Sequence, residues 1–231
     1  PGDSTSQLLA KLETNNPSGS FKDRVVKYML DSAEYRDEIA LGDTLIEATS
    51  GNMGIALAMA SIRRGYRVIL VIPPGIPKEM RSIMTALGAE LISVPDSSGI
   101  EAARSLAREL EQQGVGKVLD QFSSEDNPDT HYRTTGPELW KDTEGLLTHF
   151  VCGIGTSGTI VGVGHYLKER NSSIKVIGVR PVPDSKILGL QNWQTGNEPN
   201  FFDSNVVDDI IEVTPELAAE TTYRLIYDEG L

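Results

Sequence analysis

Short apolar runs alternate with longer amphipathic stretches along most of the chain. The apolar runs have the length of buried strands and are bounded by Gly, Pro, Asn or Asp. They predict strands at 8–12, 44–48, 68–72, 91–94, 117–120, 149–152, 175–179 and 209–213. Between them, apolar residues recur at helical spacing and predict helices at 20–35, 52–64, 77–87, 99–113, 128–140, 159–169 and 215–229. This alternation predicts an α/β fold of parallel strands joined by helical crossovers.

The length of 231 residues is enough for a sizeable core, and we expect two lobes. Residues 1–126 are expected to form the N-terminal lobe and residues 127–231 the C-terminal lobe, each a mainly parallel sheet with helices on both faces. The first predicted strand is expected to pack with the other lobe. The stretch 181–202, with its Pro, Gly, Asn and Asp, is the one long loop that the pattern predicts.

The amino-acid composition limits the kinds of partner and ligand that the chain is expected to bind. The chain has 33 acidic and 21 basic residues and a net charge of -12, which argues against nucleic acid and anionic membranes as partners. No apolar run approaches the length of a membrane span. The single cysteine, Cys152, excludes a disulfide framework and indicates a reducing compartment; core packing is its favoured role and a reactive thiol the alternative. His131, His149 and His165 lack metal-ligand spacing, so we expect no metal site.

The stretch Asn16-Pro17-Ser18-Gly19-Ser20-Phe21-Lys22-Asp23-Arg24 carries the first candidate chemistry. Ser20, with Asp23 three positions later, is typical of a helix start and places Lys22 in the first helical turn. The positive end of the helix dipole lowers the pKa of an amine there, and a neutral amine is the form that condenses with an aldehyde. Taken alone, a solvated lysine on a helix face is the commoner interpretation. Two glycine-rich loops later in the chain favour a catalytic role for Lys22 over this interpretation.

The first of these loops, Ala48-Thr49-Ser50-Gly51-Asn52-Met53-Gly54-Ile55, joins a predicted strand to a predicted helix. Gly51 and Gly54 allow close approach of the backbone, and the free amides at a helix start form an anion site suited to a carboxylate. A plain strand-to-helix turn is the alternative, because glycine turns are common in α/β folds.

The second loop, Gly153-Ile154-Gly155-Thr156-Ser157-Gly158-Thr159, again lies between a predicted strand and a predicted helix. Its glycines formally match a dinucleotide fingerprint. In a dinucleotide site an acidic residue ends the next strand, whereas here residues 175–179 run into Arg180 and Pro181. A phosphate group held by amides and hydroxyls at the helix N-terminus is therefore favoured over a dinucleotide.

Together with Gln121-Phe122 and Thr135-Gly136-Pro137-Glu138, these segments resemble the cysteine synthase group of the fold-type II pyridoxal phosphate enzymes. The resemblance runs from about Leu9 to Leu231. The stretches Asn15-Asn16-Pro17 and His149-Phe150-Val151 look more like the B form of cysteine synthase than the A form.

The resemblance implies that Lys22 is the catalytic residue and binds pyridoxal 5'-phosphate as a Schiff base. It implies that Asn52 contacts the same cofactor and that Gln121 closes the substrate pocket. Where the chain has Met53, the family usually has a threonine. The residues implied for the cofactor are Lys22, Asn52, Gly155, Thr156, Ser157, Gly158 and Thr159. Those implied for the substrate are Thr49, Ser50, Gly51, Asn52, Met53 and Gln121.

The activity that the resemblance implies is a pyridoxal phosphate-dependent β-replacement, a transferase reaction of cysteine biosynthesis. It makes L-cysteine from O-acetylserine and a sulfur donor, sulfide or thiosulfate, in a cytoplasmic homodimer. One alternative is a serine or threonine dehydratase or a cystathionine synthase of the same fold. Another is a catalytically silent paralogue that binds a partner, which the departure at Met53 suggests.

Two further expectations follow from the resemblance. Relatives continue beyond Leu231, so we expect the chain to be part of a longer protein, and a targeting peptide is left open because the chain begins at Pro1. B-form relatives place an arginine in the stretch that corresponds to 188–193, which is uncharged here. Loss of that charge predicts a preference for sulfide over thiosulfate.

Overall fold

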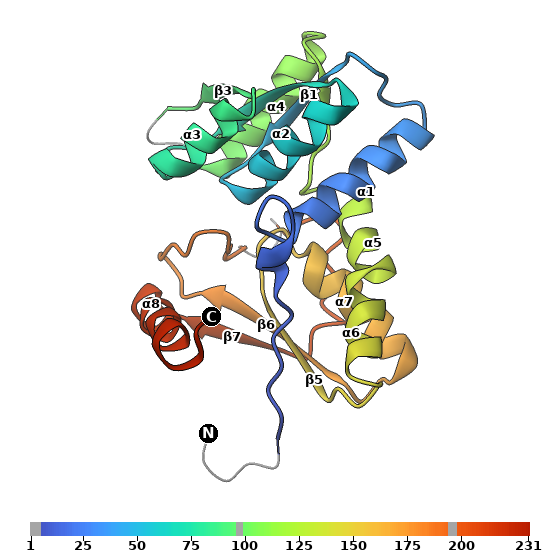
Figure 1. Cartoon of the computed structure of the whole chain (residues 1–231), viewed down its shortest axis with the longest axis vertical. Helices are drawn as coiled ribbons and strands as arrows, with labels where there is room; N and C mark the ends of the chain where they lie inside the picture. Colours follow the sequence, from blue (N-terminus) through green and yellow to red (C-terminus); the bar gives the residue numbers. More distant parts are fainter. Residues whose placement is uncertain (1–5, 96–98, 194–197) are drawn as a thin grey trace.

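Two parallel sheets organise the computed structural model, which describes residues 6–95, 99–193 and 198–231 (Figure 1). The first sheet has the strand order β3-β2-β1-β4 and the second the order β5-β6-β7. All pairings within them are parallel, so the predicted α/β class is confirmed. The strands are β1 (Thr44–Ala48), β2 (Arg67–Ile72), β3 (Glu90–Ser93), β4 (Lys117–Val118), β5 (His149–Gly153), β6 (Lys175–Pro181) and β7 (Asp209–Val213).

Helices connect these strands and, apart from α5, α6 and the end of α8, begin and end within two residues of the predicted positions. They are α1 (Lys22–Tyr35), α2 (Asn52–Arg64), α3 (Lys78–Ala86), α4 (Ile100–Gln112), α5 (Asp126–Arg133), α6 (Thr135–Asp142), α7 (Gly158–Arg170) and α8 (Pro215–Arg224). A short 3-10 turn, η1 (Glu13–Asn15), precedes α1, and a π-helical turn, η2 (Leu225–Glu229), follows α8. None of the described helices is long and apolar enough to span a membrane.

The first sheet is covered by helices on both faces, which is why all five residues of β1 are buried. Leu45 faces the core that α1, α2 and α3 form on one side. Ile46 and Ala48 face the core that α4 forms on the other side. Because side chains alternate along a strand, Glu47 shares the face of Leu45 and points toward the side of α1 and α2.

The second sheet packs against α7, which supplies Ile160, Val163 and Leu167 to a core shared with Phe150 and Val176. Helix α7 also contacts α5, and Gly162 makes the approach possible. A Cβ at Gly162 would lie 2.1 Å from the carbonyl oxygen of Pro128. The two helices are therefore held close together beside the second sheet (Figure 1).

The strand predicted at 8–12 is wrong. No strand pairs with this segment among the described residues, and Leu8 is 94% exposed. A strand needs a neighbouring backbone to complete its ladder of hydrogen bonds, and the apolar pattern alone does not supply one. The segment instead runs past α6, where the Lys11 ammonium lies 2.8 Å from the Glu138 carboxylate. The domain boundary near residue 126 stays a prediction.

The single helix predicted at 128–140 is also wrong, because α5 and α6 are separate helices. The break falls at Thr134, with φ -124° and ψ -69°. The Thr134 hydroxyl donates to the Thr130 carbonyl at 2.7 Å, and Pro137 has no N–H for a helical hydrogen bond. Of the predicted long loop 181–202, residues 194–197 lie outside the described part of the chain.

Candidate active site

Lys22 is the first residue of α1, so the prediction that it lies in the first helical turn is confirmed. The Lys22 amide donates to the Ser20 hydroxyl at 3.3 Å. The Asp23 carboxylate accepts from the amide and the hydroxyl of Ser18 at 2.9 and 2.8 Å. These side-chain-to-backbone hydrogen bonds fix the turn that presents Lys22.

Burial lowers the pKa of the Lys22 amine to about 8, while the nearby Glu47 carboxyl group acts in the opposite direction. The predicted direction is therefore confirmed. The main cause is loss of solvation rather than the helix dipole that the sequence suggests. An amine with this pKa is partly neutral near pH 7, which is the form that condenses with an aldehyde.

A chain of hydrogen bonds joins Lys22 to the second glycine-rich loop. The Lys22 Nζ donates to the side-chain Oε1 of Gln121 at 2.8 Å. The Asn127 Nδ2 donates to the backbone carbonyl of Gln121 at 2.7 Å and to the Thr156 hydroxyl at 2.9 Å. Asn127 is fully buried. Gln121 and Asn127 thus connect the lysine to a loop that is far away in the sequence.

That loop, residues 155–159, forms the N-terminus of α7. Ser157 is buried, and its backbone has a left-handed conformation with φ 70°. Its hydroxyl has no hydrogen-bond partner among the described residues. A Cβ at Gly158 would lie 2.0 Å from Asn127 Oδ1, and one at Gly155 would lie 2.5 Å from the Gly189 carbonyl oxygen. An orphaned hydroxyl, free helix amides and glycines with no room for a side chain fit an anionic phosphate group.

His131 supports the same loop from α5. Its Nδ1 shares a hydrogen bond with the Thr135 hydroxyl at 2.9 Å and its Nε2 one with the Thr159 hydroxyl at 3.2 Å. The ring also packs against Phe21, the neighbour of Lys22, with ring centroids 5.6 Å apart. Burial, with smaller contributions from Lys22 and Arg24, lowers the pKa of His131 to about 3. The imidazole is therefore neutral and orients the Thr159 hydroxyl.

The first glycine-rich loop is held by one buried side chain. The Thr49 hydroxyl accepts from the amides of Gly51 and Gly54 at 3.1 and 3.2 Å. Asn52 and Met53 open α2, so helix geometry leaves their amides without an intrahelical acceptor. The Asn52 side chain is exposed, whereas the Met53 side chain is buried in the core beneath the loop. Met53 therefore offers its backbone amide rather than a side-chain contact.

Sequence patterns missed three residues at this site. Asn127 bridges the lysine side and the phosphate side, as described above. The Trp193 indole donates to the Gly155 carbonyl at 2.9 Å and closes one end of the loop. Glu47, fully buried on β1, accepts from the Gln121 amide at 3.4 Å. No local motif marks these residues, because each contact joins segments distant in the chain.

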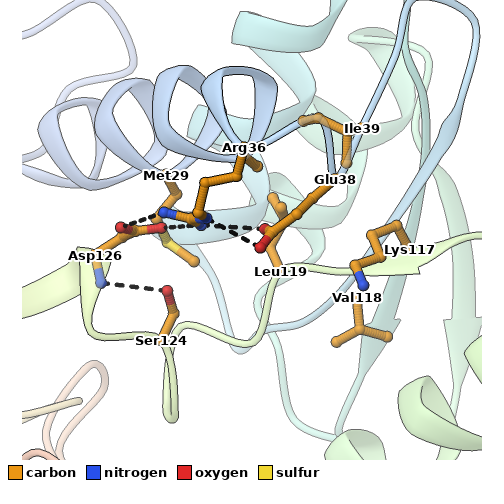
Figure 2. A pocket seen from close by; sticks show the side chains of 10 residues that line it. Met29, Arg36, Glu38, Ile39, Lys117, Val118, Leu119, Ser124 and Asp126 are labelled. Carbon is orange, nitrogen blue, oxygen red and sulfur yellow. Dashed lines mark hydrogen bonds and ion pairs between the residues drawn. The ribbon is translucent and has the colours of Figure 1, made fainter.

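A separate small pocket lies between the end of α1 and the start of α5 (Figure 2). The Arg36 guanidinium lies between two carboxylates there, 2.7 Å from Asp126 and 3.0 Å from Glu38. The Ser124 hydroxyl accepts from the Asp126 amide at 3.3 Å. These ion pairs and the hydrogen bond hold the end of α1 against the start of α5. They stabilise the structure around the site and take no part in its chemistry.

The remaining candidates are not reactive groups. Burial raises the pKa of the Cys152 thiol to about 12, which leaves no thiolate at neutral pH and supports core packing as its role. Within residues 6–95, 99–193 and 198–231, no three His, Cys, Asp or Glu side chains gather as a metal site would require.

The geometry defines a class of protein. A partly buried amine of lowered pKa, joined by hydrogen bonds to a phosphate-binding helix N-terminus, indicates an α/β enzyme that holds a phosphorylated aldehyde cofactor. Residues 2–231 match the family described as pyridoxal-phosphate dependent enzyme. The chain belongs to this family, in its cysteine synthase group. The predicted family resemblance and pyridoxal phosphate as cofactor are confirmed.

The relatives are similar over nearly the whole chain. Cysteine synthase B of Pseudomonas aeruginosa is 48% identical over 231 residues, covering 100% of this chain and 77% of the relative. Cysteine synthase B of Escherichia coli is 46% identical over 229 residues, covering 99% of this chain and 76% of the relative. The crystal structure of O-ureido-L-serine synthase superposes with a TM-score of 0.90 at 34% identity, covering 96% of this chain and 72% of that one. The chain thus spans about three quarters of the length of these relatives.

Proposed function

We propose that the protein makes L-cysteine from O-acetylserine and a sulfur donor by pyridoxal phosphate-dependent β-replacement. One observation carries the proposal. The path from Lys22 through Gln121 and Asn127 to Thr156 places a partly buried amine and a phosphate cradle in one hydrogen-bonded unit. The full-length similarity to cysteine synthase B supplies the reaction class.

The residues present fit the cofactor. Gly155, Thr156, Ser157, Gly158 and Thr159 would hold its phosphate group with backbone amides and hydroxyls. When bound, pyridoxal phosphate supplies an aldehyde that condenses with amines and a ring that withdraws electrons from the substrate α-carbon.

Lys22 would form the covalent link and later act as a base. Its Nζ, of lowered pKa, accepts the proton that leaves the α-carbon of the substrate. Gln121 holds Nζ at 2.8 Å and limits the directions in which the amine moves.

The first glycine-rich loop would bind the substrate carboxylate. The free amides of Asn52 and Met53 at the N-terminus of α2 attract an anion, and the Thr49 hydroxyl keeps the loop in shape. The exposed Asn52 side chain remains available to the cofactor and the substrate. Because the protein's net charge is -12, these local dipoles must hold anionic ligands against an unfavourable overall field.

The alternatives drawn from the sequence are not favoured, since the curated relatives of Pseudomonas aeruginosa, Escherichia coli and Staphylococcus aureus to which the chain is similar are cysteine synthases. The homodimer and the cytoplasmic location stay predictions from the family resemblance.

A spectroscopic experiment tests the proposal. Purified protein with pyridoxal phosphate should show a visible absorbance band that shifts when O-acetylserine is added and returns when sulfide is added, with L-cysteine found by mass spectrometry. Lys22→Ala should lack the band of the lysine-linked cofactor. Pyruvate formation without any sulfur donor would indicate a dehydratase, and a preference for homocysteine as acceptor a cystathionine synthase. An absent band would indicate a catalytically silent protein.

A further inference from the structure

The Glu47 carboxyl group is an unexplained buried acid beneath the site. It lies one residue before the carboxyl end of β1 and has no exposed surface. One of its oxygens, Oε1, accepts from the Gln121 amide at 3.4 Å. The other, Oε2, has no hydrogen-bond partner among the described residues. A carboxyl group is costly to bury without partners, so its presence requires a physical reason.

Gln121 connects this acid to Lys22. Its side-chain Oε1 accepts from Lys22 Nζ at 2.8 Å, and its Nε2 donates to the carbonyl of Ala48, the neighbour of Glu47, at 3.3 Å. Its backbone amide donates to Glu47 itself. A single residue therefore holds the lysine amine, the strand β1 and the buried carboxyl group in one arrangement.

We propose that Glu47 is a positioning residue for Lys22: the buried carboxyl group is held by the same Gln121 that binds the amine, and when it is ionised it favours the protonated form of that amine. The inference rests on Lys22 being the cofactor lysine, as proposed above.

Electrostatics agree with this geometry. Burial raises the pKa of Glu47 to about 8 and lowers the pKa of Lys22 to about 8. Each group opposes the effect of burial on the other, because the Lys22 charge favours the Glu47 carboxylate and that carboxylate favours the Lys22 ammonium. Two groups that interact in this way titrate as a pair.

The other titratable groups around Glu47 are either paired or neutral. Asp120, which follows β4, raises the pKa of Glu47 further. Its own carboxylate lies 2.9 Å from Arg108 and 3.5 Å from Arg104, both on α4. His131 on α5 is neutral, as its lowered pKa shows. Lys22 is thus the cation on α1 whose charge favours ionised Glu47.

The interaction with Glu47 would affect both tasks of Lys22. A neutral amine condenses with the cofactor aldehyde, and the same amine becomes a cation after it accepts the substrate α-proton. An isolated buried ammonium ion would be strongly unfavourable. An ionised Glu47 carboxylate would offset the charge of the Lys22 ammonium ion after it has accepted that proton.

The test compares Glu47→Gln with Glu90→Gln, a matched change at an exposed position on β3 of the same sheet. The Lys22 pKa is measured on cofactor-free protein from the pH dependence of its acylation by acetic anhydride, read by peptide mass spectrometry. Glu47→Gln removes the counter-charge, so the Lys22 pKa should fall by about one unit. The midpoint of the acylation profile should shift down by that amount, while Glu90→Gln leaves it unchanged. An unchanged Lys22 pKa in folded Glu47→Gln would overturn the proposal.

A second measurement needs no variant that might unfold. The side-chain carboxyl carbon of Glu47 is followed by NMR in wild-type protein labelled with 13C-glutamate. It should titrate in the same pH range as the Lys22 amine, near pH 8; titration near pH 4.3, as for an ordinary glutamate, would overturn the proposal. Both measurements are made without cofactor. Their failure is therefore distinguishable from failure of the cofactor link, which borohydride labelling tests separately.

Discussion

Replacing Gly158 with alanine should weaken cofactor binding strongly, although it adds only one methyl group. The added Cβ would lie 2.0 Å from Oδ1 and 2.5 Å from Cγ of Asn127. These distances are far below van der Waals contact, so the Asn127 side chain must move. The phosphate cradle and the support of Lys22 would then be disturbed together.

The magnitude follows from the bonds that Asn127 makes. Its Nδ2 donates to the Gln121 carbonyl at 2.7 Å and to the Thr156 hydroxyl at 2.9 Å. Each such bond contributes about 1 kcal/mol, and a buried amide left unsatisfied costs about 1–3 kcal/mol. We expect a loss of about 2–4 kcal/mol in cofactor binding, a rise in Kd of about 30-fold to 1,000-fold.

The assay is a titration of cofactor-free protein with pyridoxal phosphate, followed by absorbance, alongside the thermal unfolding midpoint. Gly99→Ala is the matched control, because a Cβ at Gly99 meets nothing within 4 Å and the position requires no left-handed backbone. It should leave Kd unchanged. If Gly158→Ala binds the cofactor within about threefold of wild type, the loop is a packing turn and the reasoning is refuted.

Three further predictions concern other parts of the site. Thr49→Val leaves the Gly51 amide without its acceptor and should raise KM for O-acetylserine about tenfold, whereas Thr49→Ser should restore it; equal values for both variants would contradict the role of the hydroxyl. Hydrogen bonds from Arg24 are the largest cause that lowers the pKa of Glu138 to about 2. Because the folded-state pKa of Glu138 is depressed, its ionised carboxylate stabilises the fold above about pH 5, and this contribution is lost as pH falls toward 2. Glu138→Gln should therefore reduce the dependence of the unfolding free energy on pH over that range; an unaltered pH dependence would contradict the prediction. The uncharged stretch 188–193 should make the specificity constant for sulfide about tenfold to a hundredfold higher than that for thiosulfate, and the reverse order would show that another cation serves the donor.

The sequence could predict the parts of the site that are local in the chain. Lys22, the loop before α2 and the loop before α7 each combine a short motif with a helix start, and these helices begin within two residues of the predicted positions. Their chemistry depends on backbone amides and small residues, which a contiguous pattern reveals. The alternation of strands and helices likewise predicts the α/β class.

What the sequence could not predict depends on contacts between distant segments. Asn127 and Thr156 are 29 positions apart, and Glu47 and Gln121 are 74 positions apart. Residues 8–12 have the apolar content of a strand but no neighbouring strand in the described chain. Met53 lies within the predicted substrate loop, yet its side chain is buried in the core, because only the three-dimensional turn decides which way it points.

The most direct test of the central claim is to locate the covalent link between the cofactor and the protein. Protein incubated with pyridoxal phosphate is reduced with borohydride, digested and analysed by peptide mass spectrometry. We predict a single modified lysine, Lys22, the one whose amine is hydrogen-bonded to Gln121 at 2.8 Å beside the phosphate cradle. Modification of another lysine, or of none, would contradict the account.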